Sequence, residues 1–297
     1  MIHAPHPCVK ALTPGFGLFA FPLVALLVAA CGGSDAQTHE ERSSTGAEQV
    51  GSVADSAESA APATDTAEAG VYRGPSVGAA KGFAALAYSA ITAVTSSPIT
   101  GNLGVSGAPV RSITGFDEVP AMKFGTDSSS PNSLRTILTQ REVDALVDDL
   151  DVRACDANYS DVAGDVTLHP GVTCVNGLQA DLRLSGRVTL DAGGDPNAFF
   201  VIRSDSSLTI ADETVLVLAN GAQGCGVFWQ GKMQVTIGRN VAFVGTLIAG
   251  TGIAMHSGST LLGRALAQTA DVVLDGNAIT VPTYDSSGSG GKCAHLQ

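Results

Sequence analysis

Short runs that alternate apolar and polar residues dominate the C-terminal half of the chain. Each run has the length of a strand and is followed by residues that favour turns. Five runs resemble one another: VTLD at Val188, LTIA at Leu208, VTIG at Val235, IAMH at Ile253 and VVLD at Val272. The last three recur at about 18 to 20 residues, and the longer gap before Val235 suits a loop insertion.

A second series keeps a similar step, with VFWQ at Val227, GTLIA at Gly245 and GRALA at Gly263. A step of about 18 residues fits one coil of a β-helix that has three short faces per coil. A β-sandwich also has many short strands, but its strands do not usually keep a fixed sequence step. The two series therefore predict a mainly β domain wound as a solenoid.

The middle of the chain has a different pattern. The segment SLRTILTQREVDALVDDLDVRA has apolar residues at helical spacing, at Leu134, Ile137, Leu138, Val143, Leu146, Val147 and Leu150. Asn132 or Ser133 could cap its start. The pattern leaves open whether the segment is one helix or two helices broken near Thr139. A single long helix would cover one face of the coils with its Leu/Val stripe.

The N-terminal residues have the features of an export signal. An apolar run over about residues 16–30 follows Lys10 and is short for a transmembrane span. It ends in LVAAC, which resembles a bacterial lipobox, and the resemblance implies that Cys31 carries lipid and anchors the chain to the membrane. An ordinary signal peptide with an incidental Cys31 is the alternative. Gly32, rather than Asp, follows the cysteine, which favours the outer membrane or the cell surface.

These patterns divide the chain into four parts. We expect a lipoprotein signal peptide over residues 1–30, a flexible Ala/Ser/Glu-rich tether over 31–75, one β domain over 76–284 and a flexible tail over 285–297. The tether has almost no bulky apolar residues, so it cannot bury enough surface to offset the entropy of ordering.

Composition and charge narrow the picture further. The chain is 44% hydrophobic but only 5% aromatic, so its core must consist of Ala, Val, Leu and Ile, and its 35 glycines suit many tight turns. The net charge is -12, from 16 basic and 28 acidic residues. This argues against a nucleic-acid partner, because phosphate contacts need a basic surface.

The domain has little that could catalyse a reaction. The sequence has no His-Glu-x-x-His pair and no dinucleotide fingerprint, and Arg264 stands where a phosphate-binding loop needs lysine after Gly263. His169 precedes Pro-Gly and fits a turn, and His256 stands alone on a strand. We therefore expect a protein that is not an enzyme and has no cofactor or metal.

Four cysteines remain after Cys8 in the leader and Cys31: Cys155, Cys174, Cys225 and Cys293. In an exported chain they suggest two disulfides, and four cysteines allow three pairings. We favour Cys155–Cys174, which are nearest in sequence, and Cys225–Cys293, which would tie the tail to a coil. The alternative is a buried Cys225 thiol and a free Cys293.

The segment GAQGCGVFWQ at residues 221–230 resembles the signature of the ice-binding-like family, also called domain of unknown function 3494. Neighbouring motifs agree in order, from FAALA at Phe83 and ITGNLG at Ile99 to GRALA at Gly263 and VLDGNAIT at Val273. The resemblance implies a right-handed, discontinuous β-solenoid of triangular section with one long helix packed alongside. It also implies ice binding as the best-known activity.

An ice crystal surface is thus the expected partner. Ice binding needs a flat, rigid face on which short Thr and Ser side chains order water, and charges would disturb that order. Family members often have Thr-Ala/Gly-x-Thr/Asn at successive turns, and Ser257-Gly258-Ser259-Thr260 is a near match, whereas two of the three equivalent turns are charged. We predict one exposed strip made of Thr236, Thr251, Ser257, Ser259 and Thr260. Tyrosine at Ser259 or Thr260 should then abolish ice activity without unfolding.

Two other functions stay open. The domain could be a surface adhesin that recognises another surface or a polysaccharide without ice activity, or an enzyme of an unrecognised kind. A contiguous uncharged Thr/Ser face would favour ice, whereas a concave groove with an aromatic or acidic lining would favour the adhesin. Trp229 and the other few aromatic residues are expected in the core.

Overall fold

The computed structural model describes residues 74–116, 121–127, 133–159, 164–175 and 181–283. The predicted signal peptide, nearly all of the predicted tether and the predicted tail lie outside the described residues, and with them Cys31 and Cys293. The described residues belong to one compact unit that begins at Thr64.

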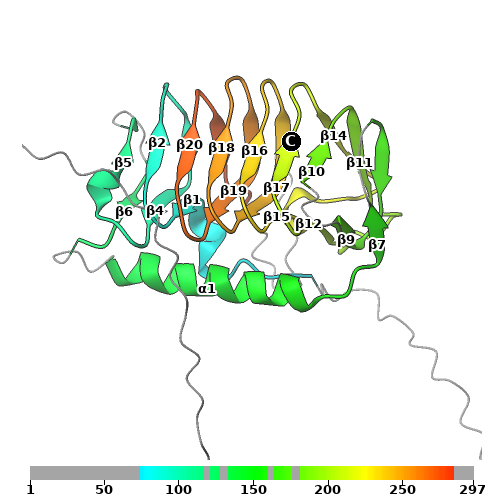
Figure 1. The fold of residues 1–297 in the computed structure, drawn as a ribbon, viewed down its shortest axis with the longest axis horizontal. Coiled ribbons are helices and arrows are strands. Elements are labelled where there is room, and N and C mark those ends of the chain that lie inside the picture. The colour runs from blue at the N-terminus through cyan, green and yellow to red at the C-terminus, as the bar shows by residue number, and fades with distance from the viewer. Residues whose placement is uncertain (1–73, 117–120, 128–132, 160–163, 176–180, 284–297) are drawn as a thin grey trace, which may run out of the picture. The chain divides into compact units, whose positions relative to one another are not determined.

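The domain is mainly β, with parallel sheets and, among the described residues, a single α-helix (Figure 1). An eleven-stranded sheet has the order β6 (Lys123–Phe124), β4 (Asn102–Val105), β1 (Phe83–Ala87), β19 (Thr260–Ala267), β17 (Ala242–Ala249), β15 (Val227–Gly231), β12 (Phe200–Ser204), β9 (Gly171–Val175), β7 (Ala157–Tyr159), with β21 (Ala278–Thr280) and β3 (Ile99–Thr100) attached through β19. A seven-stranded sheet has the order β10 (Leu182–Leu184), β13 (Leu208–Ile210), β16 (Val235–Ile237), β18 (Ile253–Met255), β20 (Val272–Leu274), β2 (Ile91–Ala93), β5 (Ile113–Thr114). The three-stranded sheet is β14 (Val215–Ala219), β11 (Arg187–Asp191), β8 (Val166–Leu168), and short 3-10 helices span Gly78–Gly82, Val110–Ser112 and Gly224–Gly226.

Successive turns of the chain stack on one another, and each turn has three sides. The helix-covered side is formed by β15, β12, β9, β1 and their neighbours, and the second side is the seven-stranded sheet. The third side consists of the three-stranded sheet and then of β21, β3 and the first halves of β17 and β19. These two long strands bend at Gly245 and Gly263, so that β21 pairs with residues 260–262 of β19 and β1 pairs with residues 265–266.

The repeats in the sequence correspond to sheets in the fold. The runs at Leu208, Val235, Ile253 and Val272 are β13, β16, β18 and β20, which are neighbours in the second side, and the other series is β15, β17 and β19. The assignment of VTLD at Val188 to the first series is wrong, because this run is β11 on the third side. The run at Val188 alternates like the other runs because every strand buries one face. The side to which it belongs therefore depends on its place within the coil and not on its alternation.

The order of the strands in space differs from their order in the sequence. The C-terminal strands β19, β20 and β21 pair with the N-terminal strands β1, β2 and β3, for example Ala265 beside Ala85. From there β4 and β6 extend the stack to one end, and the stack is resumed by β7 at the other end. The chain crosses between the two ends through α1.

The helix α1 (Ser133–Val152) is continuous and runs along the stack of strands (Figure 1). Its predicted apolar stripe is wrong at the start, because Leu134 and Leu138 are 65% and 54% exposed. The buried side has helical spacing but begins with polar residues, namely Thr136, Thr139, Gln140, Val143, Leu146 and Leu150. Gln140 is accommodated there because it accepts a hydrogen bond from the buried Ser106 hydroxyl at 3.2 Å.

Two apolar cores stabilise the domain. One lies inside the coils and includes Trp229, whose indole N–H donates to the Val244 carbonyl oxygen at 2.9 Å. The other lies between α1 and the strands of the helix-covered side, and it includes Phe83, Phe228 and Leu150. Trp229 is fully buried, as the sequence predicted.

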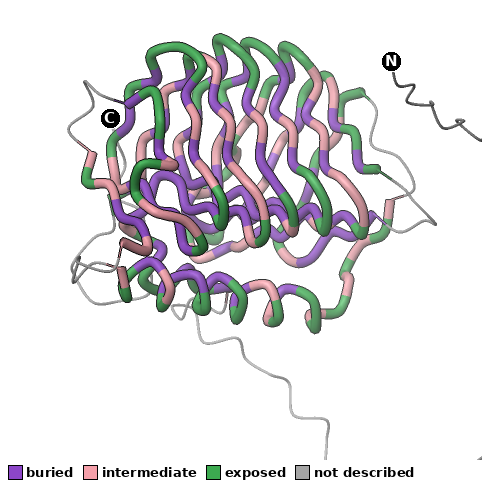
Figure 2. The backbone as a smooth tube through the Cα atoms, turned by 60° about the vertical axis from the view of Figure 1, so that its left-hand side comes forward, coloured by how far each residue is buried: buried purple, intermediate pink, exposed green. Residues whose placement is uncertain are grey.

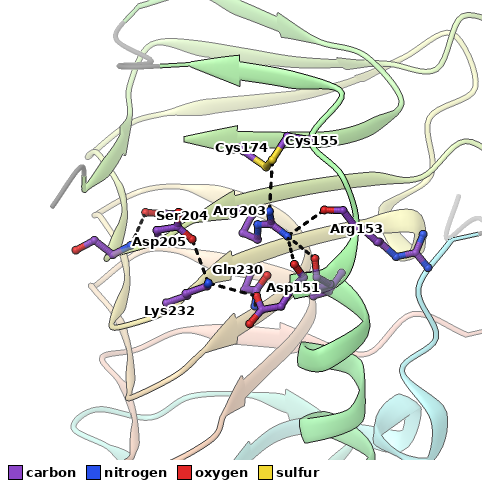
Figure 3. Close-up of polar contacts among 11 residues, drawn as sticks. Asp151, Arg153, Cys155, Cys174, Arg203, Ser204, Asp205, Gln230 and Lys232 are labelled. Atoms are coloured by element: carbon purple, nitrogen blue, oxygen red, sulfur yellow. Dashed lines mark hydrogen bonds and ion pairs between the residues drawn. A yellow bond between two sulfur atoms is a disulfide. The ribbon is translucent and has the colours of Figure 1, made fainter. Parts of the chain in front are cut away.

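The C-terminal end of α1 is fixed to the sheet by Arg203 of β12 (Figure 3). The Arg203 guanidinium donates hydrogen bonds to the carbonyl oxygens of Leu150, Asp151 and Arg153, the last two at 3.1 and 3.4 Å, and lies 3.4 Å from Cys155 Sγ. A helix end leaves such carbonyl oxygens without intrahelical partners. One side chain therefore replaces the backbone donors that the helix lacks at this end.

A disulfide and a polar cluster hold the same region. Cys155 and Cys174 form the disulfide that the sequence predicted, with Cα atoms 5.7 Å apart. The Gln230 amide donates to the Asp151 carboxylate at 3.0 Å, and Lys232 Nζ lies 3.8 Å from the same carboxylate (Figure 3). Cys225 is also disulfide-bonded, and Cys293, its predicted partner, lies outside the described residues.

Candidate functional site

Helix α1 packs on only one side of the stack, and most strands of the other two sides, though not β14, alternate buried and more exposed residues (Figure 2). On the second side each three-residue strand has two buried outer positions and a central position that faces outward, as in β16 and β18. The central residues are aligned by the strand pairing, so they form one row across the sheet.

This row, called the second-side row below, has only one charge, at its end. It consists, in spatial order, of Arg183, Thr209, Thr236, Ala254, Val273, Thr92 and Thr114. Neighbouring strands lie about 4.8 Å apart, so the row repeats short side chains at that interval. The side chains are Thr and small aliphatic groups, which have few rotamers to lose when they are immobilised.

The surroundings of the row differ along the sheet. Towards β10 and β13 there is a shallow hollow of about 340 Å³, lined by Arg183, Thr209, Ile210, Ala211, Asp212, Thr236, Gly238 and His256. Gly238 is required there, because a Cβ atom would lie 2.5 Å from the backbone nitrogen of Asp212 and 2.7 Å from the backbone carbonyl carbon of Ala211. Asp271 and Asp275 flank β20 and are partly exposed. Beside β10, at the same edge as this hollow, the Ser206 hydroxyl, aided by the Ser207 N–H, lowers the pKa of Asp181.

The five residues predicted as one strip do not lie on one strip. Thr236 belongs to the second-side row, whereas Thr260 begins β19 on the third side. Ser257 lies in the corner between these two sides, and Thr251 lies in the turn between β17 and β18, at the opposite end of the strands of the second side. The prediction of a single strip is therefore wrong, because the residues are close in sequence but fall on different sides of one coil.

Ser259 corrects the prediction most clearly, because it is fully buried. Its hydroxyl donates to the Gly238 carbonyl oxygen and accepts from the Val241 N–H at 3.1 Å. Thr214 and Asn277 occupy the equivalent corner in other coils and also bond to backbone groups there. The serine of the near-match motif thus hydrogen-bonds the buried backbone groups at this corner. Replacing Ser259 with Tyr would therefore disrupt the core and would not test the surface.

Sequence reasoning missed five of the six uncharged members of the second-side row: Thr209, Ala254, Val273, Thr92 and Thr114. A signal for them exists, because each is the middle residue of a short alternating run such as LTI, VVL or ITA. Thr92 and Thr114 could not be placed beside the others from spacing, since they come from N-terminal strands paired with the C-terminal coil.

Two absences within the described residues bear on their chemistry. The part of the chain that the structure describes contains no group of three or more His, Cys, Asp or Glu residues that could hold a metal ion. Within the same residues, no helix has the length and apolar character needed to cross a membrane.

The described residues form a mainly β domain of stacked parallel strands, in which a row of six uncharged residues lies on a sheet that α1 does not cover. The chain belongs to the ice-binding-like family, whose sequence profile matches residues 85–280. It is 34% identical over 218 residues to an ice-binding protein of Nostoc sp. (strain HG1), which covers 70% of this chain and 74% of the relative. An ice-binding protein of Colwellia sp is 30% identical over 220 residues, 70% of this chain and 83% of the relative.

Solved structures agree with this membership. The fold is similar to the crystal structure of an ice binding protein from an Antarctic biological consortium, with a TM-score of 0.63, 31% identity, and coverage of 72% of this chain and 93% of that chain. The family is described as ice-binding-like, and these relatives are named ice-binding proteins. The resemblance seen in the sequence is therefore confirmed.

Proposed function

We propose that this protein binds ice through its second side, without catalysis. The observation that carries the proposal is the row of six uncharged outward-facing residues, aligned across a sheet that no helix of the described residues covers. We further propose that the strands wind as a right-handed, discontinuous β-solenoid of triangular section, a shape that the pairing of three stacks of parallel strands supports.

The physical argument starts from rigidity. Stacked coils fix the row in one arrangement before it meets ice, so little conformational entropy is lost on binding. Thr offers a methyl group and a hydroxyl, and Ala and Val offer apolar surface, so water above the row can order without a strongly hydrated charge. The charged side chains of Arg183, Asp212, Asp271 and Asp275 lie at the end or flanks of the row.

The test replaces a small residue in the middle of the row. Ala254→Tyr in the full-length chain should reduce thermal hysteresis and inhibition of ice recrystallisation at least tenfold, because the ring would hold ice away from the neighbouring residues. The fold should persist, since an outward-facing substitution usually changes stability by about 0.5 kcal/mol or less.

Ala145→Tyr, on the exposed side of α1, is the matched control and should keep full activity. Full activity in a folded Ala254→Tyr protein would rule out the second side as the site. A wild-type protein without either activity would favour the surface adhesin instead.

We also propose that the protein is exported and held at the outer membrane or cell surface by lipid on Cys31. The lipobox-like LVAAC supports this proposal. Cys31→Ala should move the protein from the membrane fraction to the soluble fraction after processing, because a lipid anchor contributes about 0.8 kcal/mol per buried CH₂. Mass spectrometry of the mature N-terminus measures the attachment, and soluble wild-type protein cleaved elsewhere would contradict it.

A further inference from the structure

We propose that the chain after Thr283 forms a strap across the third side, fastened at its far end by a disulfide between Cys293 and Cys225. The surface under the strap is the row of outward-facing residues Val244, Leu262 and Thr280, called the third-side row below. The inference concerns a contact within the chain and does not rest on ice binding.

The bonding of Cys225 is the first observation. Cys225 is disulfide-bonded, and it is 8% exposed. The other two cysteines of the described residues, Cys155 and Cys174, bond to each other. The partner of Cys225 therefore lies outside the described residues, at Cys8, Cys31 or Cys293. The first two belong to the predicted export signal and lipid anchor, so the third is the remaining partner.

Cys225 lies at the corner where the third side meets the helix-covered side. Its short 3-10 helix, Gly224–Gly226, directly precedes β15 and packs against β17 and β19. A Cβ atom at Gly224 would lie 2.4 Å from Cγ1 of Val244. The disulfide is therefore placed beside the first member of the third-side row.

The chain leaves β21 at the same corner. The Val281 N–H donates to the Thr100 carbonyl oxygen at 3.1 Å, just after the last residue of β21. The next position beside β19 is occupied by β1, since Ala265 pairs with Ala85. The chain therefore cannot continue past Thr280 as a strand beside β19, and a strap along the corner is a path that remains.

The length of the segment suits this path. Three strand intervals of about 4.8 Å, from β21 through β19 and β17 to β15, make a distance of about 15 Å. Residues 284–292 lie between Thr283 and Cys293, and such a segment spans at most about 33 Å when it is fully extended. The segment can thus reach Cys225 and still follow the surface of the corner.

The chemistry of the row and of the segment is compatible. Val244 and Leu262 are apolar and half-buried, whereas Ala242 and Thr260, in the neighbouring outward row, are exposed. Residues 284–292 read YDSSGSGGK, with one aromatic residue next to the end of the described chain. Gly allows tight bends and close approach of the backbone, and the tyrosine ring offers apolar area for the Leu262 side chain.

Such a strap has two consequences. It fixes β21, a strand of only three residues, to the coil that contains β15. It also covers part of the third side and leaves the second side open. A partner that binds the domain would then meet the second-side row and not the third-side row.

The first experiment maps the disulfide in the mature protein, purified without reductant. Trypsin releases residues 204–232, which contain Cys225, and residues 293–297, which begin with Cys293. We expect these two peptides to be joined until they are reduced, and the protein to be a monomer in non-reducing electrophoresis. A free Cys225 thiol, a bond from it to Cys8 or Cys31, or a covalent dimer would overturn the inference.

The second experiment measures coverage by hydroxyl-radical footprinting with mass spectrometry. The wild type is compared with Cys293→Ala and with Cys225→Ala, in which the remaining thiol is alkylated. The oxidation of Leu262 should rise about threefold or more in each variant, because the bond that keeps the segment at a high local concentration is lost. Val273 of the second-side row is the matched aliphatic control, and its oxidation should not change.

The two variants remove the same bond from opposite ends, so either one decides the result if circular dichroism shows that only one is folded. Equal oxidation of Leu262 in the wild type and in the folded variants would mean that the disulfide holds no strap over the row, and the inference would fail. The ice activity of the second side is measured separately, so neither result alters the test of the proposed function.

Discussion

Replacing Gly263 with alanine is expected to lower the free energy of unfolding by about 3 kcal/mol. A Cβ atom at this position would lie 1.8 Å from the Gly245 carbonyl oxygen. Both groups belong to the backbone at the corner where β17 and β19 bend, so no side-chain rotation can relieve the clash. The adjacent strands must then separate at the boundary between the helix-covered side and the third side. Urea unfolding followed by circular dichroism measures the change.

Gly82→Ala is the matched control. A Cβ atom there would meet only the Asn102 side chain at 3.4 Å, an ordinary contact, so the stability should change by about 0.5 kcal/mol or less. A Gly263→Ala protein as stable as the control would show that the corner can widen without cost. It would then contradict the close packing of the two strands.

The second large effect is expected for Arg203→Met, with a loss of about 2–3 kcal/mol. Methionine keeps much of the apolar stem but removes every donor to the carbonyl oxygens of Leu150, Asp151 and Arg153. These oxygens close the C-terminal end of α1, so amides in the last turn of the helix should exchange hydrogen faster. Hydrogen exchange with mass spectrometry measures this, together with urea unfolding.

Arg141→Met, on the exposed side of α1, controls for the loss of a positive charge. It should leave both the stability and the exchange of the last helical turn unchanged, since surface ion pairs contribute little. Equal effects of the two substitutions would mean that Arg203 acts through its charge alone and not through its hydrogen bonds. The Cys155–Cys174 disulfide must be kept oxidised in both proteins, because it anchors the same segment.

Much of the fold could be predicted from the sequence because strand repeats leave a regular step. The runs at Val235, Ile253 and Val272 keep a step of about one coil and are neighbours in one sheet, and Trp229, which was expected in the core, is buried. The assignment of the run at Val188 to the same series was wrong, because strands on every side of a coil show the same alternation of buried and exposed residues. The step also gave no signal for the pairing of β20 with β2, since contacts between distant segments leave no local periodicity.

The candidate site was harder to predict than the fold. Ser259 was expected at the surface, in a polar turn motif. At this corner, however, backbone groups of Gly238 and Val241 need a buried polar partner, and the Ser259 hydroxyl provides it. The predicted buried face of α1 was wrong at the start of the helix for the same reason. Thr136 and Gln140 are buried there, whereas Leu134 is exposed. Polarity predicts exposure only where no buried backbone or side-chain group offers a hydrogen bond.

The place of the C-terminal coil within the stack limits how such a chain can evolve a larger surface. In the seven-stranded sheet β20 lies between β18 and β2, and among the described strands β10 and β5 are the two at the ends. A coil duplicated after Thr280 would find no open strand to extend, unlike a repeat added to the end of a simple array. A larger sheet therefore requires duplication of an internal coil, for example between the segments that encode β13 and β16. The inserted coil would separate these two strands and leave the register of the others unchanged. Selection for greater area then acts on the interior of the chain and not on its termini.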